Sequence, residues 1–204
     1  THFDTSSVRR NVSWVRGVNS LLPPDVAVLW AVEVDDSFHA RYIAEARRYR
    51  YVLLNATVRP ALLARRVGWF HVHLDVEAMA KAARHLIGWH DFTAFRAAGC
   101  QAKTPVRLMH SAQVTRDGDY LLFDFHANGF LHHMVRNLVG ALVYVGKGAK
   151  PPEWMGEVLM HCDRSLAAPT FPADGLYLCG VDYADRWPLP GNGRIIAKPR
   201  LPMP

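Results

Sequence analysis

The chain of 204 residues is 50% hydrophobic and 21% charged, a composition that excludes an intrinsically disordered protein. Its longest apolar run, Leu138–Val145, is far shorter than the roughly 20 residues of a membrane helix, so no membrane partner is expected. The formal net charge of +6 favours a polyanionic partner such as nucleic acid.

The basic residues are nineteen arginines and only five lysines. Arginine is preferred where phosphates are gripped by two parallel hydrogen bonds or where flat rings are stacked. A GC-rich coding bias would produce the same excess, so composition alone leaves both interpretations open. The three cysteines, Cys100, Cys162 and Cys179, are scattered and form no CxxC pair, which indicates a reduced, cytoplasmic protein.

The first half of the chain predicts a helix followed by two strands. Apolar residues recur at helical spacing in residues 8–22, after Ser6 and Ser7, so we expect a capped amphipathic helix there. Valines and a tryptophan alternate in residues 25–34, which predicts a strand. A second strand is expected over residues 46–54, after a loop.

The middle of the chain predicts a helix and a hairpin. Asp75 is placed to cap a helix whose buried side carries Met79, Ala82, Ala83 and Leu86. A loop rich in small and basic residues follows. Residues 106–114 and 120–127 then read as two antiparallel strands joined by a turn at "RDGD".

The last part predicts a long helix over residues 130–148, a short helix near Trp154 and a strand over residues 175–183. Helices and strands are mixed, and the hairpin implies antiparallel pairing. We therefore expect an α+β fold built on one curved, mostly antiparallel sheet flanked by helices.

The strand over residues 46–54 carries two kinds of side chain on its two faces. Tyr49 and Tyr51 share one face, and Arg48 and Arg50 share the other. Aromatic rings can stack on nucleic-acid bases, and guanidinium groups can bind phosphates. On spacing alone, a tyrosine buried in the core is the more common explanation even for Tyr49, and we expect that role for Tyr51.

The helix over residues 130–148 has a polar side formed by His132, His133, Arg136 and Asn137. By spacing alone this side is a solvated helix face. The histidines lack the spacing of a metal site, so no metal is expected. No phosphate-binding loop, nucleophile elbow or dinucleotide fingerprint is present.

Four motifs occur in a characteristic order: "FHARYIAEARRYRY", "DFTAFRA", "HHMVRNLVG", and the pair Asp163–Arg164 followed by "GLYL". Together they resemble the TruA family of tRNA pseudouridine synthases, over nearly the whole chain up to about Asp185. The resemblance implies a pseudouridine-synthase-like fold and a cofactor-free isomerase. Its substrates would be uridines of the tRNA anticodon stem-loop, at family positions 38–40, and its members are similar in being homodimers.

The resemblance also assigns roles to single residues. Tyr49, the first tyrosine of "RYRY", would stack on the extruded uridine and take part in catalysis. Arg136, the arginine of "HMVRN", would pair with the catalytic aspartate and aim it at the substrate. Leu176, in "GLYL", would form a wall of the uracil pocket.

Further basic residues are expected to bind the tRNA. Arg41 in "FHAR" resembles a residue that lines the cleft, and Arg48 and Arg50 would meet the phosphate backbone. Arg96 and Lys103 lie in a loop that would reach the tRNA.

One departure from the family pattern is large. The family's nucleophile is the aspartate of a "GRTDxGVH" stretch, and that stretch is absent from this sequence. We therefore expect residues 1–187 to be the C-terminal portion of the catalytic core, followed by a Pro-rich tail at 188–204, and this chain to be inactive alone. The alternatives are a non-catalytic RNA-binding module with the same fold, and a structural protein whose arginines reflect only codon bias.

Overall fold

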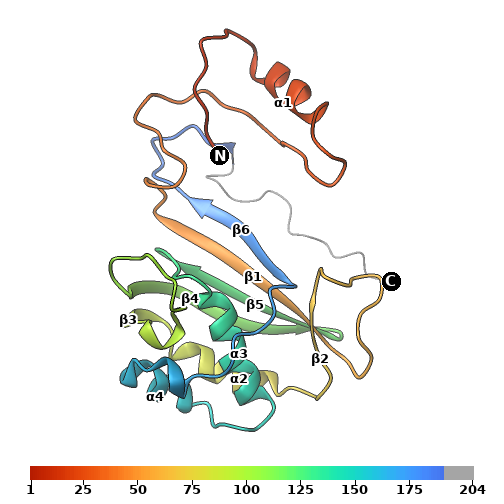
Figure 1. Cartoon of the computed structure of the whole chain (residues 1–204), viewed down its shortest axis with the longest axis vertical. Coiled ribbons are helices and arrows are strands. Elements are labelled where there is room, and N and C mark those ends of the chain that lie inside the picture. Colours follow the sequence, from red (N-terminus) through yellow and green to blue (C-terminus); the bar gives the residue numbers. More distant parts are fainter. Residues whose placement is uncertain (191–204) are drawn as a thin grey trace. The chain divides into compact units, whose positions relative to one another are not determined.

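The computed structural model describes residues 1–190 and divides the chain into two units. One unit contains Thr1–Glu45 and the chain from Val181 onward, and the other contains Ala46–Gly180. The second unit holds most of the sheet and all the helices that pack on it (Figure 1). The predicted tail lies outside the described residues, except for residues 188–190.

The sheet has six strands: β1 (Ala46–Asn55), β2 (Gly68–Phe70), β3 (Gly88–Asp91), β4 (Val106–Asp117), β5 (Tyr120–Ala127) and β6 (Leu176–Asp182). Five of them follow the order β2-β1-β5-β4-β3, and β6 also pairs with β1. The pairs β1–β5, β4–β5 and β3–β4 are antiparallel, and β1–β2 is parallel. The predicted α+β class with a mostly antiparallel sheet flanked by helices is confirmed.

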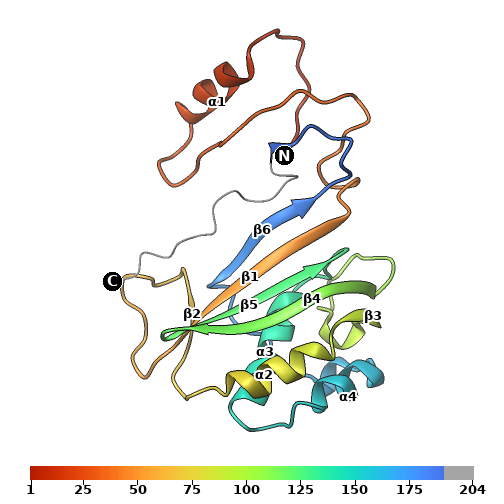
Figure 2. The ribbon, with the colours of Figure 1, turned by 180° about the vertical axis from the view of Figure 1, so that it is seen from behind.

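Helices cover one face of this sheet, as the two opposite views show (Figures 1 and 2). They are α2 (Val76–Arg84), α3 (Met134–Gly146) and α4 (Trp154–His161), with the short 3-10 helices η1 (Thr93–Phe95) and η2 (Arg164–Leu166). The core lies between the helices and the sheet, where α3 is buried along almost its whole length. The short helix expected near Trp154 is confirmed as α4.

Strand register decides which face of β1 enters this core. Tyr51 lies opposite Phe123, and Leu53 lies opposite Leu121. All four side chains are fully buried in the core cluster, so the expectation that Tyr51 packs in the core is confirmed. Because side chains alternate along a strand, Arg48 and Arg50 point to the face that the helices do not cover.

The predicted helix after Asp75 is confirmed as α2. The Asp75 carboxylate accepts a hydrogen bond from the backbone N–H of Ala78 at 3.0 Å, which is the geometry of an N-cap. The four apolar residues expected on its inner side are all fully buried. Local capping and hydrophobic spacing therefore agree with the tertiary packing at this helix.

The N-terminal predictions are wrong in two respects. The first helix, α1, runs only from Asn11 to Asn19, has no side-chain cap and buries none of its residues. Residues 25–34 form no strand, although their alternation predicted one. The Asn19 side chain instead bonds both backbone groups of Val28, at 2.7 and 2.9 Å. Alternation predicts the two faces of a strand, but a strand forms only where a partner strand supplies hydrogen bonds.

The helix expected from residue 130 begins later. His133 has a left-handed backbone, with φ of 59°, and α3 starts at Met134. The expected polar side is solvated only in part, because His132 is exposed whereas Asn137 is only 1% exposed. Its amide donates to the Phe95 carbonyl at 2.8 Å and accepts from the Thr170 hydroxyl at 2.6 Å. Asn137 therefore ties α3 to η1 and to the segment that follows η2.

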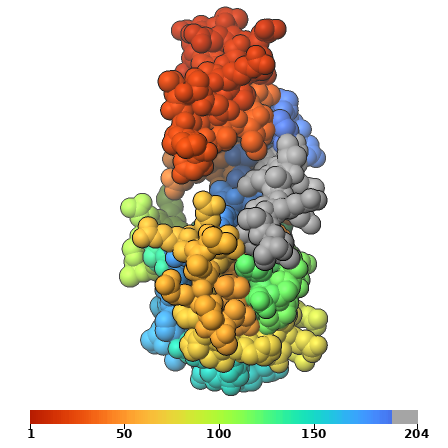
Figure 3. Space-filling model, turned by 90° about the vertical axis from the view of Figure 1, so that its right-hand side faces the viewer, coloured from red at the N-terminus to blue at the C-terminus, as the bar shows by residue number. Residues whose placement is uncertain are grey.

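The connection between β1 and β2 is long and lies on the surface. It spans residues 56–67, and both Val58 and Leu62 are strongly exposed. The yellow-orange atoms of this connection are visible in the space-filling view (Figure 3). Such a length is needed because β1 and β2 are parallel, and parallel neighbours cannot be joined by a tight turn.

Within residues 1–190, no helix combines the length and the apolarity that crossing a bilayer requires. Cys100, Cys162 and Cys179 all carry free thiols.

We predict that Asn137→Ala destabilises the fold. The substitution leaves the buried Phe95 carbonyl without its donor, which costs about 1–3 kcal/mol. Urea unfolding followed by circular dichroism measures the change in the free energy of unfolding. Lys81→Ala, at an exposed position of α2, is the control and should change stability little. Equal stability of the two variants would show that the Asn137 contacts contribute nothing.

Candidate active site

Tyr49 lies on the helix-covered side of β1, at the margin of the core. It is opposite Phe125 in the sheet register, and its ring meets Phe130 edge to face, with centroids 5.0 Å apart. Partial burial raises the pKa of the Tyr49 phenol, and the nearby Arg47 guanidinium offsets part of this increase. The phenol is therefore neutral at physiological pH, and its half-exposed ring is held at a fixed angle.

Arg136 lies near the start of α3 and is half-buried. Its Nε donates to the Phe171 carbonyl at 2.8 Å, and its own carbonyl accepts from the Phe171 N–H at 3.2 Å. Among residues 1–190, no carboxylate forms an ion pair with Arg136. The terminal nitrogens of this guanidinium can therefore bind an anion, and a carboxylate or a phosphate matches their geometry.

Leu176 is the first residue of β6, and it packs partly buried against the same core as Tyr49. Phe130 and Phe171 pack at this margin too. The structure therefore brings Tyr49, Arg136 and Leu176, from three different elements, to the helix-covered side of the sheet. An anion-binding guanidinium and an apolar, aromatic margin together suit a ligand that has a flat ring and negative charge.

Tyr51 contacts the segment around Phe171 from inside the core, a role that the sequence did not indicate. Its hydroxyl donates to the Pro172 carbonyl at 3.0 Å, and its ring meets Phe171 edge to face. Burial raises the pKa of Tyr51 strongly, Asp174 raises it further, and Arg136 lowers it. The buried phenol thus stays neutral and holds the segment that precedes Leu176.

Gly175 fixes the end of that segment. Its φ is +98°, and an added Cβ would lie 2.3 Å from the Val52 carbonyl oxygen. Only glycine fits such a close approach in this conformation. The first residue of the "GLYL" motif is therefore required by the backbone, and it positions Leu176 beside β1.

The structure does not bring Arg48 and Arg50 to the Tyr49 side of the sheet. Arg50 lies opposite Asp124 and forms a two-pronged ion pair with it, at 2.7 and 2.8 Å. This hydrogen-bonded carboxylate raises the pKa of Arg50, despite partial burial. Arg48 lies opposite His126 on the same face. A tRNA contact by either arginine stays a prediction.

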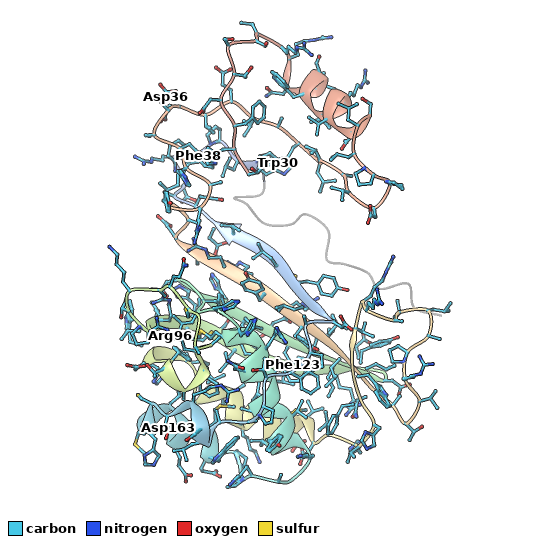
Figure 4. The ribbon with its side chains drawn as sticks, viewed as in Figure 1. Trp30, Asp36, Phe38, Arg96, Phe123 and Asp163 are labelled. Atoms are coloured by element: carbon cyan, nitrogen blue, oxygen red, sulfur yellow. The ribbon has the colours of Figure 1, made fainter. Side chains whose placement is uncertain are left out.

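The other predicted basic residues lie in two different units. Arg96 follows η1 (Figure 4), and its Nη2 donates to the carbonyls of Cys100 and Ala102 at 2.6 and 2.9 Å. Lys103 is exposed in the same loop. Arg41 is exposed in the N-terminal unit, where its backbone N–H donates to the His39 ring.

No set of three or more histidine, cysteine, aspartate or glutamate side chains is gathered as metal ligands would be, within the part of the chain that the structure describes.

Residues 82–184 match the family model described as tRNA pseudouridine synthase. The chain is similar to tRNA pseudouridine synthase A of Aromatoleum aromaticum, with 69% identity over 98% of the chain and 76% of that protein. It is 62% identical to tRNA pseudouridine synthase A of Thiobacillus denitrificans, over 93% of the chain and 73% of that protein. The enzyme of the same name from Methylobacillus flagellatus is 56% identical, over 95% and 74%.

Proposed function

The chain belongs to the tRNA pseudouridine synthase family, and we propose that it isomerises uridine to pseudouridine in the anticodon arm of tRNA. The observation that supports this proposal is that Tyr49 and Leu176 pack against one core, while Arg136, on helix α3 of the same core, is bonded to Phe171, which packs against that core too. A non-catalytic RNA-binding module would not require a half-buried guanidinium that lacks a carboxylate partner among residues 1–190.

The reaction is a rearrangement within one nucleotide. The bond between N1 of uracil and C1′ of ribose breaks, the base turns, and a bond forms between C5 and C1′. The proton of C5 is lost and N1 gains one, so nothing is oxidised, reduced or transferred to a second substrate. The protein must therefore supply a nucleophile, hold the base and exclude competing water, and no cofactor is needed.

Tyr49 is proposed to hold the extruded base. A uridine inside a stem or loop must leave its stack before its glycosidic bond can be reached. A flat ring offers the displaced base a new stacking partner, worth about 1–3 kcal/mol. The edge-to-face contact with Phe130 fixes the Tyr49 ring, so little conformational freedom is lost when the base binds.

Arg136 is proposed to orient the catalytic carboxylate. Its bond to Phe171 uses only Nε, which leaves the terminal nitrogens for a two-pronged carboxylate pair. Such a pair would hold the carboxylate ionised and aimed at the nucleotide. Leu176 would close the apolar side of the pocket, where it would exclude water from the reacting atoms.

The location and assembly of the protein are part of the same proposal. We place it in the cytoplasm, since its three free thiols suit a reducing compartment. The net charge of +6 supports binding of a whole tRNA arm. An anticodon arm is larger than one uridine pocket, so we propose a homodimer in which two subunits face one tRNA.

The activity itself is tested by carbodiimide labelling of tRNA followed by primer extension. A polypeptide of these 204 residues should form no pseudouridine, because no carboxylate among residues 1–190 pairs with Arg136. A protein that also carries the "GRTDxGVH" segment should form it. Product from the 204 residues alone would show that one of their own carboxylates is catalytic. No product from either protein would disprove the proposed activity.

Tyr49→Ala should lose most of the activity of the protein that carries this segment, because the stacking surface disappears. Tyr49→Phe keeps the ring and should still bind tRNA. Release of tritium from tRNA labelled at uracil C5 measures the rate, and filter binding measures the affinity. Full activity in Tyr49→Ala would rule out the stacking role. Tyr42→Ala, at an exposed position of the other unit, is the control for loss of a tyrosine ring.

Arg136→Ala should lower turnover far more than tRNA affinity, since the residue is proposed to act through a carboxylate. Arg136→Lys should also turn over poorly, because an ammonium cannot reproduce the planar fork. Single-turnover kinetics separates the rate from the affinity. Arg84→Ala, exposed on α2, should affect neither. Parallel losses of rate and affinity in Arg136→Ala would indicate a phosphate contact instead.

The protein should be a dimer in solution, which multi-angle light scattering at micromolar concentration measures directly. A mass equal to one subunit, for the protein with its "GRTDxGVH" segment present, would contradict the proposed assembly.

A further inference from the structure

Arg164 lies in η2, and its guanidinium donates to neutral oxygens of the chain. Asp163, labelled in Figure 4, caps this short helix, because its carboxylate accepts from the Ser165 N–H at 2.8 Å. Nη1 of Arg164 donates to the Ala168 carbonyl at 2.9 Å and to the Ala167 carbonyl at 3.4 Å. Among residues 1–190, no carboxylate forms an ion pair with Arg164. The guanidinium therefore holds the chain that follows η2.

The second terminal nitrogen of Arg164 connects this chain to helix α3. Nη2 donates to the Thr170 hydroxyl at 3.3 Å and to the Asn137 side-chain oxygen at 3.4 Å. The Thr170 hydroxyl donates to the same Asn137 oxygen at 2.6 Å. The three side chains thus form a closed triangle of hydrogen bonds. Asn137 directly follows Arg136 in the sequence, and Thr170 directly precedes Phe171.

These two neighbours of the triangle are bonded to each other. Arg136 Nε donates to the Phe171 carbonyl at 2.8 Å, and the Phe171 N–H donates to the Arg136 carbonyl at 3.2 Å. The direction of the Arg136 guanidinium therefore depends on where the Phe171 carbonyl lies. A planar guanidinium fork pairs with a carboxylate only in a narrow range of orientations. A small shift of this carbonyl would misalign the fork.

Other contacts restrain the same stretch of chain in a different way. The backbone of α3 lies so close to it that an added Cβ on Gly140 would collide with the Pro169 carbonyl oxygen. The Tyr51 hydroxyl donates to the Pro172 carbonyl at 3.0 Å. These contacts set how near the stretch lies to the core. The triangle holds the Thr170 side chain, and with it the direction of the chain that enters Phe171.

Arg164 is suited to hold the chain and poorly suited to bind a substrate. Both of its terminal nitrogens already donate to the protein. Arg136 instead uses Nε for its bond to Phe171, which leaves its terminal nitrogens for a partner. A lysine at position 164 would keep the positive charge, but one ammonium cannot span two separate sets of acceptors as a planar fork does.

We propose that Arg164 is a positioning residue for Arg136. It fixes residues 167–170 against Asn137, and this stretch aims the Arg136 guanidinium through the Phe171 carbonyl. The inference rests on the proposed function, because it presumes that Arg136 orients the catalytic carboxylate. Loss of Arg164 would slow the reaction without weakening tRNA binding, since a misplacement of about 1 Å at the reacting groups can cost about 100-fold in rate.

The test compares Arg164→Lys with Arg116→Lys in the protein that carries the "GRTDxGVH" segment. Both substitutions keep the net charge. Arg116 is a matched control, because its Nη2 also donates to an asparagine side chain and a backbone carbonyl, those of Asn55 and Leu74, at 3.1 and 3.0 Å. Neither of these groups contacts Arg136 through the bonds described above.

The first readout is the NMR signal of the Arg136 Nε–H, which is assigned by its disappearance in Arg136→Lys. Arg164→Lys should shift this signal and speed its exchange with water, because the bond to the Phe171 carbonyl is weakened. Arg116→Lys should do neither. A loss of stability alone would leave the signal of the folded protein where it is, so the readout separates positioning from a merely structural role.

The second readout is the single-turnover rate, measured beside the tRNA affinity by filter binding. Arg164→Lys should lower the rate about 10- to 100-fold and leave the affinity unchanged. Arg116→Lys should change neither quantity. If Arg164→Lys does not fold, Thr170→Val carries the same prediction, because it removes one corner of the triangle at an exposed position.

An unmoved Arg136 signal or an unchanged rate in Arg164→Lys, with pseudouridine formed by the unaltered protein, would overturn the inference and leave the proposed function standing. Parallel losses of rate and affinity would also overturn it, because Arg164 would then contact the RNA. The same effects in Arg116→Lys would overturn it as well, since they would reflect a general loosening. Absence of pseudouridine from the unaltered protein would overturn both proposals.

Discussion

Strand β1 is hydrogen-bonded along both edges, and this constraint fixes the rest of the second unit. On one edge it pairs with β5 over eight residues of register, from Arg47 to Leu54. On the other edge it pairs with β2 and with β6. A strand held on both sides cannot slip by one residue, because a slip would move every side chain to the opposite face. Tyr49 and Tyr51 must therefore face the helices.

The same register keeps two kinds of arginine apart. On the face without helices, Arg50 meets Asp124 directly across the sheet, and the pair neutralises itself. Such a partly exposed pair contributes only about 0–1 kcal/mol to stability, so its main effect is to satisfy both charges. On the helix side, Arg136 has no carboxylate partner among residues 1–190, so its positive charge is not matched within the part of the chain that the structure describes.

The segment between η2 and β6 links packing to the candidate site. Its Phe171 is bonded through backbone atoms to Arg136 and packed against the ring of Tyr51. The buried Tyr51 and the half-buried Arg136 therefore both hold this short stretch of chain. Any change in the core under Tyr51 would shift the Arg136 guanidinium and Leu176 together.

The sequence by itself determined the elements that depend on near neighbours, and the order of motifs that identified the family. The Asp75 cap, the turn between β4 and β5, and the two faces of β1 all follow from spacing and local hydrogen bonding. Tyr49, Arg136 and Leu176 could be proposed as site residues only through the resemblance, since each has an ordinary structural explanation alone.

The tertiary structure decided what depends on distant partners. Residues 25–34 alternate like a strand, yet they form none, and Asn137 looks solvated, yet it is buried against Phe95. The carboxylate that pairs with Arg50 belongs to Asp124, which lies 74 positions away in the sequence. Local rules act over a few residues, whereas pairing and burial depend on which segments the register brings together. That physical difference separates what the sequence could predict from what only the folded chain decides.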